Sequence, residues 1–539
     1  MTASASRRTT LHALIRANLY FAPRPLPFMT RIAARLACLC IALFIATPPR
    51  VGSVFAQPAT DLTIDDLSAV IERTVTDDAT AGATWGVHAV NLRSGNVLFS
   101  KQGDRNLIPA SNAKLYTAAA ALERLGPAYR FRTRVYADGP VDDGVLKGNL
   151  IVRGSGDPTI GGEEQQDNVT RIFRAWADSL RALGVRRIEG DVVGDDNLFS
   201  DAPLGTGWSW DDTVYAYSAE IGALSFNLNK ISLRVRGGSA PGAPGRIRWS
   251  PLNTDYVSII NRSRTVDRGA GVEEDYERLR GRNTFVVGSR VPVGRTEVED
   301  LAVRNPTRYF AHVLREVLLD EGISVRGRAV DADDAPIQPD YGSTSLRPVA
   351  SYRSAPLQEI VTTLNRESVN LYAEMLLRTL AVVSPPQDPE AEPGSSELGA
   401  RAVLETLGSA GVDTSRVVIA DGSGLSRQNL MTPRGTVQLL QHMWTHEDPA
   451  VSRAFYESLA VGGQNGTLQY RFGAGEPADG NVRAKTGTLS HVSTLSGYVT
   501  TSRGTPVAFS IFCNNYAAEG RVVRRAQDAI VNAFARLAQ

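Results

Sequence analysis

The sequence predicts an α+β protein whose main domain is interrupted by a large β-rich insertion. Residues 63–100 combine a run of apolar residues at helical spacing with two strand-like runs, and residues 494–539 combine strand-like runs with a final helix. Helical segments fill residues 357–444, whereas residues 129–347 contain mainly short β-like runs separated by Gly, Pro and Asp. We therefore expect helix and antiparallel strands at both ends of one domain, helices between them, and the insertion inside it.

The individual elements follow from local signals. Thr63 with Asp66 resembles a helix capping box, and residues 85–100 alternate and turn at 94–96 like a hairpin. The insertion should contain one helix, at 169–183, and strands at 131–137, 148–153, 187–194, 230–235 and 284–293. After it we expect helices at 357–364, 369–380, 396–410 and 433–444, strands at 482–489, 494–500 and 506–514, and a closing helix.

Ser111 and Lys114 form the first candidate catalytic pair. Residues 111–125 are rich in Ala and Leu and lack Gly and Pro before Gly126, which predicts a helix with the serine in its first turn. Residues three apart share one helix face. A lysine with a lowered pKa can take the proton of a serine hydroxyl and so make it a nucleophile. Taken alone, the pair could equally be an ordinary helix with an exposed lysine.

Lysine is scarce in this chain, which strengthens the catalytic interpretation. Of 58 basic residues only five are lysines, and two of these, Lys114 and Lys485, fall in recognisable motifs. Arginine cannot release its proton in a protein, so a retained lysine indicates a need for a removable proton or a compact ammonium group.

Two further motifs complete a set with the first. Ser368 and Asn370 form Ser-x-Asn, and Lys485, Thr486 and Gly487 form Lys-Thr-Gly on a predicted strand. Ser-x-x-Lys, Ser-x-Asn and Lys-Thr-Gly occur in this order in penicillin-binding proteins and serine β-lactamases. Each motif alone could be accidental, but three in the correct order indicate an active site.

The chain resembles the D-alanyl-D-alanine carboxypeptidase/endopeptidase family, the low-molecular-mass class C penicillin-binding proteins of peptidase family S13. The segments that carry the resemblance span most of the chain and are residues 109–122, 154–158, 370–374, 421–427 and 483–489. Val369 departs from related sequences, which often have a polar residue there, but the motif does not use this side chain. The resemblance implies the three-layer serine β-lactamase/DD-peptidase (transpeptidase-like) fold, with the first and last helices on one face of the sheet.

The resemblance also implies a mechanism. Ser111 would attack the bond between two D-alanines of a peptidoglycan stem peptide, with Lys114 as base, and Ser368, positioned by Lys114 and Asn370, would relay the proton. The backbone N–H groups of Ser111 and Thr488 would hold the oxyanion. The substrate carboxylate would bind Lys485, Thr486 and Thr488, with Gly487 allowing close approach, and β-lactams would inhibit by stalling as acyl-enzymes. No cofactor or metal is implied.

The family also suggests how the domains are divided. The catalytic domain would comprise residues 57–129 and 347–539, one inserted domain residues 130–154 and 228–346, and a nested domain residues 155–227. An aromatic stretch from Trp208 to Tyr217 could face the substrate, which makes Tyr215 or Tyr217 a candidate contact. It could equally be the core of a small domain.

Residues 1–56 read as a secretory signal. They contain seven arginines and no acidic residue, and an eleven-residue apolar run, 36–46, that is too short to span a bilayer comfortably. Small residues at the end of this segment suit cleavage before Gln57, and translation could begin at Met29. Cys38 and Cys40 would leave with the leader, so Cys513 would stand alone and no disulfide could form within the mature chain. We expect an exported periplasmic or extracellular protein without a membrane anchor.

Other functions are less well supported. Without the leader the chain has a net charge of about −6, which argues against a nucleic-acid partner. His442 and His446 share a helix face, but Met443 stands where a zinc protease has Glu, so a solvated pair is the expectation. The alternatives that remain are a β-lactamase-like hydrolase and a non-catalytic peptidoglycan-binding protein. The balance of carboxypeptidase and endopeptidase action and the oligomeric state stay open.

Overall fold

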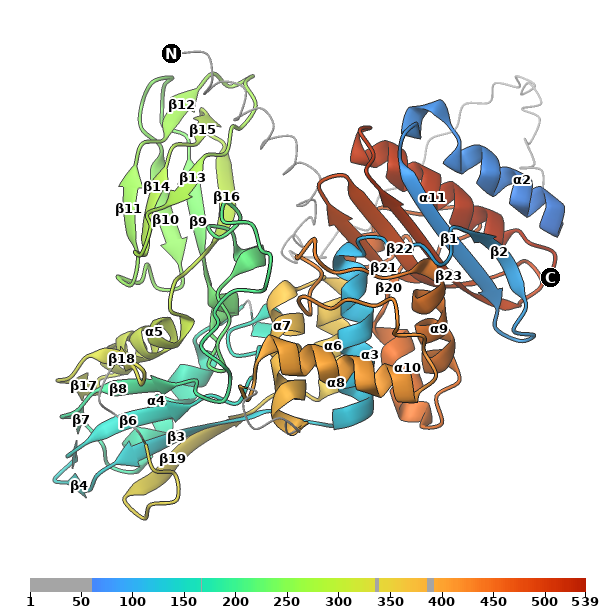
Figure 1. The fold of residues 1–539 in the computed structure, drawn as a ribbon. Helices are drawn as coiled ribbons and strands as arrows, with labels where there is room; N and C mark the ends of the chain where they lie inside the picture. Colours follow the sequence, from blue (N-terminus) through green and yellow to red (C-terminus); the bar gives the residue numbers. More distant parts are fainter. Residues whose placement is uncertain (1–60, 166, 335–338, 385–391) are drawn as a thin grey trace, which may run out of the picture.

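The computed structural model describes residues 61–165, 167–334, 339–384 and 392–539. The expected leader, with its cleavage position and Met29, lies outside these residues. Figure 1 shows a sheet covered by helices on both faces, and an insertion that extends to one side of it. Among the described helices, none combines the length and the apolar character needed to cross a membrane.

The central sheet joins the two ends of the chain. Its six antiparallel strands run in the order β2, β1, β23, β22, β21, β20. Their bounds are β1 Thr84–Asn91, β2 Val97–Lys101, β20 Ala460–Val461, β21 Arg483–Leu489, β22 Val492–Thr500 and β23 Pro506–Asn514. Strand β1, the first strand in the sequence, therefore pairs with β23, the last strand. Strands β1 and β2 form the hairpin that was predicted at 85–100.

Two helices cover the outer face of this sheet. Helix α2, Ile64–Val75, begins with the predicted capping box, in which Thr63 and Asp66 each bond the backbone of the other. Helix α11, Gly520–Ala535, packs against it, and their buried side chains form one apolar core with the sheet. Leu62 and Leu537 form a β-bridge, so the two ends of the described chain lie together.

A helical layer covers the opposite face. It consists of α3 Ala113–Leu125, α6 Leu357–Arg366, α7 Asn370–Val383, α8 Ser396–Ser409, α9 Pro433–Trp444 and α10 Pro449–Ser458. Helix α3 lies in the middle of this layer, and every residue from Ala113 to Leu122 is buried. The many alanines of α3 let neighbouring helices approach it closely, which fixes the position of its N-terminal end. Helix α3 ends at Gly126, whose φ of 78° a side-chain-bearing residue rarely adopts.

The part of the insertion next to the helices contains a five-stranded sheet. Its order is β18, β8, β6, β3, β19, and a smaller sheet runs β17, β7, β5, β4. The bounds are β3 Arg132–Asp138, β4 Val141–Asp142, β5 Val145–Leu146, β6 Asn149–Arg153, β7 Arg187–Ile188, β8 Val192–Asp195, β17 Ser324–Val325, β18 Ala329–Asp331 and β19 Leu346–Arg353. Helices α4 Arg171–Ala182 and α5 Pro306–Asp320 complete this part.

The outer part of the insertion is built from residues 230–302. Three small sheets run β10–β9–β16, β11–β14–β13 and β12–β15. The strands are β9 Lys230–Arg236, β10 Arg246–Ser250, β11 Ser258–Asn261, β12 Arg264–Val266, β13 Tyr276–Arg278, β14 Thr284–Val287, β15 Arg290–Pro292 and β16 Thr296–Ala302. This part forms the upper lobe of the insertion in Figure 1.

Strand pairing divides the insertion differently from the sequence expectation. Strand β8, within the expected nested unit 155–227, pairs with β6 from the preceding segment and with β18. Residues 155–227 therefore share a sheet with their neighbours, and the segment with sheets of its own is 230–302. Helix α5 was also missed, so the expectation of a single helix in the insertion is wrong. Its Asn305-Pro306 start resembles a turn in sequence, although it serves as cap and first residue of the helix.

Candidate active site

Ser111 lies at the point where α3 begins. It belongs to the short 3₁₀ turn Ala110–Asn112, which leads directly into α3, so the serine precedes the helix by one turn rather than lying within it. Ala110 adopts a left-handed φ of 46°. Gly424 lies close to the Ala110 carbonyl, and a Cβ on Gly424 would be only 1.9 Å from that carbonyl oxygen. This close packing against the 421–427 turn fixes the backbone that carries Ser111.

Lys114 is completely buried and has three partners. Its Nζ lies 3.1 Å from Ser111 Oγ, 2.6 Å from Asn370 Oδ1 and 2.6 Å from the Ser423 carbonyl oxygen. Two of these partners are carbonyl-type oxygens, which can only accept hydrogen bonds. A neutral amine has two N–H groups to donate to them, which leaves its lone pair for the hydroxyl hydrogen of Ser111. This geometry suits a base that takes the proton of the serine.

Burial changes the acidity of both active-site amines. It lowers the pKa of Lys114 to about 7, against the opposing influence of the negative charges of Asp421 and Glu374. Burial, and then the positive charge of Lys114, lower the pKa of Lys485 well below its ordinary value. Both side chains are fully buried, and two charged amines so placed repel each other. At neutral pH a substantial fraction of Lys114 is therefore unprotonated.

Lys485 holds the serine of the second motif. It lies on β21, and its Nζ donates to Ser368 Oγ at 2.8 Å and to the Thr486 carbonyl at 2.9 Å. Ser368 has a left-handed φ of 61° directly before α7, which is an uncommon conformation for serine and turns its backbone sharply into the helix. The two amines thus each hold one hydroxyl group, Lys114 that of Ser111 and Lys485 that of Ser368.

Asn370 connects the second motif to the insertion. It is the first residue of α7, and while its Oδ1 accepts from Lys114, its Nδ2 donates to the Tyr217 carbonyl at 2.7 Å. The Tyr217 ring stacks on Tyr215 at 5.6 Å, and its hydroxyl donates to Asp212 at 2.6 Å. The structure thus places the Tyr217 backbone beside the site. Contact of its side chain with a substrate stays a prediction.

Strand β21 lies tightly against the serine turn because it carries a glycine there. A Cβ on Gly487 would lie 2.2 Å from Thr494 Oγ1 and 2.9 Å from the Ser111 nitrogen. Asn112 Nδ2 donates to the Lys485 carbonyl at 3.1 Å, and Thr494 Oγ1 donates to the Pro109 carbonyl at 2.7 Å. Thr486 donates to Thr467, and Thr488 pairs with Ser493 of β22. The third motif therefore packs against the serine turn at Lys485 and Gly487.

The sequence of the chain matches that of a known peptidase family. The profile of the D-Ala-D-Ala carboxypeptidase 3 (S13) family matches residues 67–537. The chain belongs to this family. The motif-based expectation of an S13 enzyme of the D-Ala-D-Ala carboxypeptidase class is therefore confirmed.

Characterised relatives and solved structures agree with this assignment. A D-alanyl-D-alanine carboxypeptidase from Actinomadura sp. (strain R39) is 34% identical over 479 residues, which is 86% of this chain and 83% of the relative. DacB of Haemophilus influenzae is 28% identical, over 81% of this chain and 86% of its own. The crystal structure of penicillin binding protein 4 (DacB) from Haemophilus influenzae superposes with a TM-score of 0.73 at 27% identity, covering 86% of this chain and 97% of that one. A β-lactam complex of that protein gives 0.68 at 25% identity, over 85% and 97%. The expected α+β fold is confirmed.

The sequence did not predict a network of buried acidic side chains that lies next to Lys114. Asp421 accepts from the Gly424 and Ser426 backbone N–H groups at 2.7 and 2.6 Å and from Trp208 Nε1 at 2.8 Å. Glu374 accepts from the Ser423 N–H at 2.8 Å, and so holds the residue whose carbonyl binds Lys114. Burial raises the pKa of Glu374 to about 7. Glu374 and Asp421 lie in two of the segments that carry the family resemblance, 370–374 and 421–427, but the sequence does not show that they lie close together.

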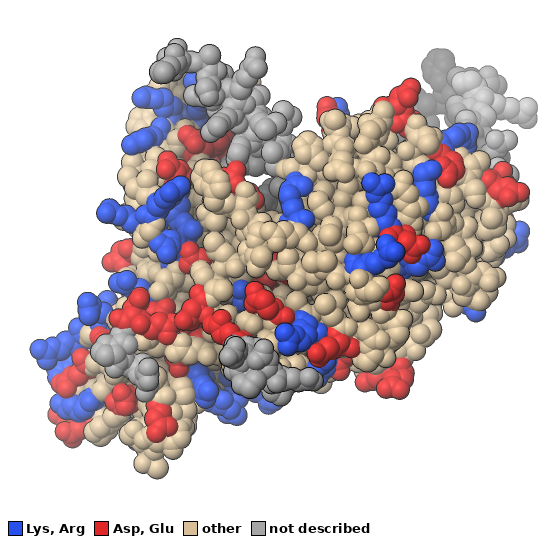
Figure 2. Space-filling view, viewed as in Figure 1, with Lys and Arg blue, Asp and Glu red and all other residues tan. Residues whose placement is uncertain are grey.

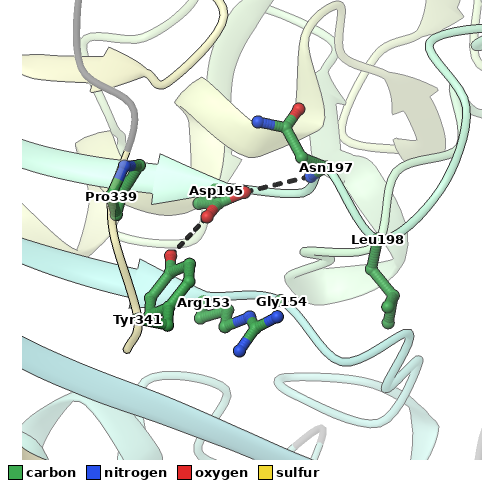
Figure 3. Close-up of a pocket in the computed structure, with 7 residues that line it drawn as sticks. All are labelled: Arg153, Gly154, Asp195, Asn197, Leu198, Pro339 and Tyr341. Atoms are coloured by element: carbon green, nitrogen blue, oxygen red, sulfur yellow. Dashed lines mark hydrogen bonds between the residues drawn. The ribbon is translucent and has the colours of Figure 1, made fainter. Parts of the chain in front are cut away.

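Two other features of the S13 peptidase lie apart from these motifs. Figure 3 shows a pocket in the insertion, which includes no residue of the three catalytic motifs and is lined by Arg153, Gly154, Asp195, Asn197, Leu198, Pro339 and Tyr341. In it, Tyr341 donates to Asp195, and the Arg153 guanidinium lies 4.1 Å from the Tyr341 ring centroid. On the face seen in Figure 2, basic and acidic side chains are intermixed, without a continuous basic surface.

Proposed function

We propose that the chain removes the terminal D-alanine from peptidoglycan stem peptides by way of an acyl-enzyme on Ser111. The observation that carries this proposal is the position of Lys114 Nζ, 3.1 Å from Ser111 Oγ and held by two oxygens that only accept. Ser111 Oγ attacks the carbonyl carbon of the D-Ala-D-Ala bond while its proton passes to Lys114. The lowered pKa of Lys114 supports this role, because a base is most effective when its pKa lies near the working pH.

The second motif supplies the proton for the leaving group. Ser368 Oγ is held by Lys485 at 2.8 Å, and Asn370 binds Lys114 at 2.6 Å, so both motifs converge on the same amine pair. In the proposed path the proton taken from Ser111 reaches the leaving D-alanine nitrogen through the Ser368 hydroxyl. The C–N bond breaks, and the peptide remains attached to Ser111 as an ester. Water then hydrolyses the ester and regenerates the free serine.

Groups on strand β21 would bind the two negative charges of the reacting substrate, the oxyanion and the terminal carboxylate. The backbone N–H groups of Ser111 and Thr488 would hold the oxyanion of the tetrahedral intermediate, and the close packing at Gly487 supports this pairing. Lys485, Thr486 and Thr488 would bind the substrate carboxylate. A β-lactam presents a carbonyl and a carboxylate in a similar arrangement, so we expect it to acylate Ser111 and to be released slowly.

Exchange of Ser111 tests the acyl-enzyme directly. Ser111→Ala should remove both covalent penicillin labelling, measured by intact-protein mass, and D-alanine release from purified muropeptides. Ser94→Ala, in the exposed hairpin turn, is the matched control and should retain both. Labelling that persists in Ser111→Ala, or that maps to another residue, would contradict the proposal. Loss of labelling with unchanged D-alanine release would point to a different nucleophile for the peptide.

The same samples separate the remaining alternatives. Turnover of a chromogenic β-lactam as fast as peptide hydrolysis would favour a β-lactamase, although among the described residues Lys114, and no carboxylate, is hydrogen-bonded to Ser111. Mass analysis of cross-linked muropeptides distinguishes endopeptidase cleavage from carboxypeptidase action. Export belongs to the proposal as well, and N-terminal sequencing of protein secreted by the native host should give Gln57.

A further inference from the structure

A half-buried cluster of nitrogen and oxygen ligands lies at the end of α3 remote from Ser111. Glu123 stands near the C-terminal end of α3, His442 in the last turn of α9, and His446 two residues beyond α9. His442 Nε2 lies 2.7 Å from Glu123 Oε1, and the two imidazole rings meet edge to face with centroids 5.3 Å apart. One ligand atom from each of the three residues lies within 4.8 Å of those of the other two.

These spacings suit one metal ion. Two ligand atoms at about 2.0–2.1 Å from a tetrahedral zinc ion are roughly 3.3 Å apart, so only small side-chain rotations are needed to close the site. The side chains of His442 and Glu123 are 22% and 14% exposed, so the ion would be shielded on the protein side and open to water on the other. Two imidazoles and one carboxylate, with water in the fourth position, form a common zinc ligand set.

The backbone around His446 supports this arrangement. His446 Nδ1 lies 3.0 Å from the Asp448 nitrogen and 3.3 Å from the Asp448 carbonyl oxygen, so it can accept from the N–H when Nε2 carries the ring proton, or donate to the carbonyl when Nδ1 carries it. When Nε2 binds a cation, Nδ1 carries the proton and can donate it to that carbonyl, as metal-bound histidines usually do. Asp448 is itself fixed as the N-cap of α10, where its side chain accepts from Ala450.

The other clusters of possible ligands in the described residues are weaker. Two of them consist of carboxylates only, and no independent observation points to a ligand at either: Asp196, Asp331 and Asp333, and Glu274, Glu297 and Glu299. In the cluster of Asp255, His312 and Glu316, the Glu316 side chain already accepts from Thr254 and the Asp255 backbone, and the Asp255 side chain is 86% exposed. The histidine pair with Glu123 is the cluster that offers two soft nitrogen ligands.

We infer that Glu123, His442 and His446 bind a divalent transition-metal ion, with zinc the best match. The ion would join the C-terminal end of α3 to α9, which packs against β1 and β23. It would thus stabilise the position of α3, which carries Lys114 at its other end and follows directly after the turn that holds Ser111, without contacting the substrate. The sequence expectation of a solvated histidine pair overlooked Glu123, because that residue lies 319 positions away from His442.

Calorimetric titration with zinc chloride tests this inference. Protein without a histidine tag, dialysed against chelator, should bind one equivalent of Zn²⁺ with high affinity. His446→Ala should weaken that binding more than tenfold, and it should fold normally because, within the described part of the chain, the His446 ring hydrogen-bonds only to the backbone of Asp448 and otherwise contacts the His442 ring. His312→Ala, in the weaker cluster, is the matched control and should bind as the parent does.

Spectroscopy with Co²⁺ provides an independent measurement. Cobalt in the same site should give the visible absorption of a four-coordinate ion, and His442→Ala and His446→Ala should each abolish it. The inference is overturned if the parent binds no stoichiometric zinc, or if His446→Ala and His442→Ala both bind it as tightly as the parent. Peptidase activity is not needed as a readout, so failure here leaves the proposed function untouched.

Discussion

Lowering the pH from 8 to 6 should slow acylation of the enzyme about tenfold. The neutral form of Lys114 is the one that can accept the Ser111 proton, and burial lowers the pKa of this lysine to about 7. With that pKa, roughly nine tenths of Lys114 is neutral at pH 8 and roughly one tenth at pH 6. An ordinary lysine, with a pKa of 10.5, would instead give a rate that still climbed steeply through pH 8 and 9.

Acylation by a fluorescent penicillin, followed by stopped flow, measures this step without later hydrolysis. The carboxylate of the β-lactam stays ionised over the whole range, so the profile reports the protein. Lys114→Arg is the informative variant, because arginine keeps a positive charge but cannot act as base. It should acylate at least a thousandfold more slowly at every pH. A parent profile that is flat from pH 5.5 to 8.5, or rapid acylation by Lys114→Arg, would refute the reasoning.

Three further predictions concern packing and burial. Gly487→Ala should slow acylation more than tenfold, since the added Cβ would meet Thr494 Oγ1 at 2.2 Å, whereas Gly473→Ala, with 3.8 Å of space, should acylate as the parent does. Arg378→Met should destabilise the protein by about 3–5 kcal/mol in denaturant titration, because it leaves the buried Glu374 carboxylate without its ion-pair partner. Adding Glu374→Gln should restore part of that loss, and a double variant as unstable as the single one would contradict this. Burial raises the pKa of Cys513 to about 12, so this thiol should react with a disulfide reagent at pH 8 only after unfolding.

The candidate catalytic residues could be recognised in the sequence because each motif is short and its internal spacing is set by one local segment. Ser111 lies in the turn that leads into α3 and Lys114 in the first turn of that helix, whereas Lys485 to Gly487 share a strand. The structure brings these segments into contact with one another and with the Ser368 segment. The contact between Lys114 and the Ser423 carbonyl could not be predicted, because every residue has a backbone carbonyl and the sequence does not indicate which one will be a hydrogen-bond acceptor.

The insertion shows where sequence reasoning fails. Boundaries between β-rich units depend on which strands pair, and β6 pairs with β8 across an intervening segment, residues 154–191, that contains α4. Nothing in the alternation of either strand specifies its neighbour, since both are short and mostly buried. The hydrogen-bond partners of buried or half-buried acidic side chains cannot be predicted from the sequence for the same reason. Glu374 bonds to Ser423 and Glu123 to His442, and both partners are distant in the sequence.

The pairing of β1 with β23 has a consequence for biosynthesis. The proposed nucleophile, Ser111, is among the first of the described residues to be synthesised, but Lys485 and strand β21 follow only several hundred residues later. A nascent or truncated chain therefore has this serine without the surrounding candidate site, which is complete only when the C-terminal strands have joined the sheet. If Ser111 is the nucleophile, as proposed, nearly the whole chain must be synthesised before the enzyme can react.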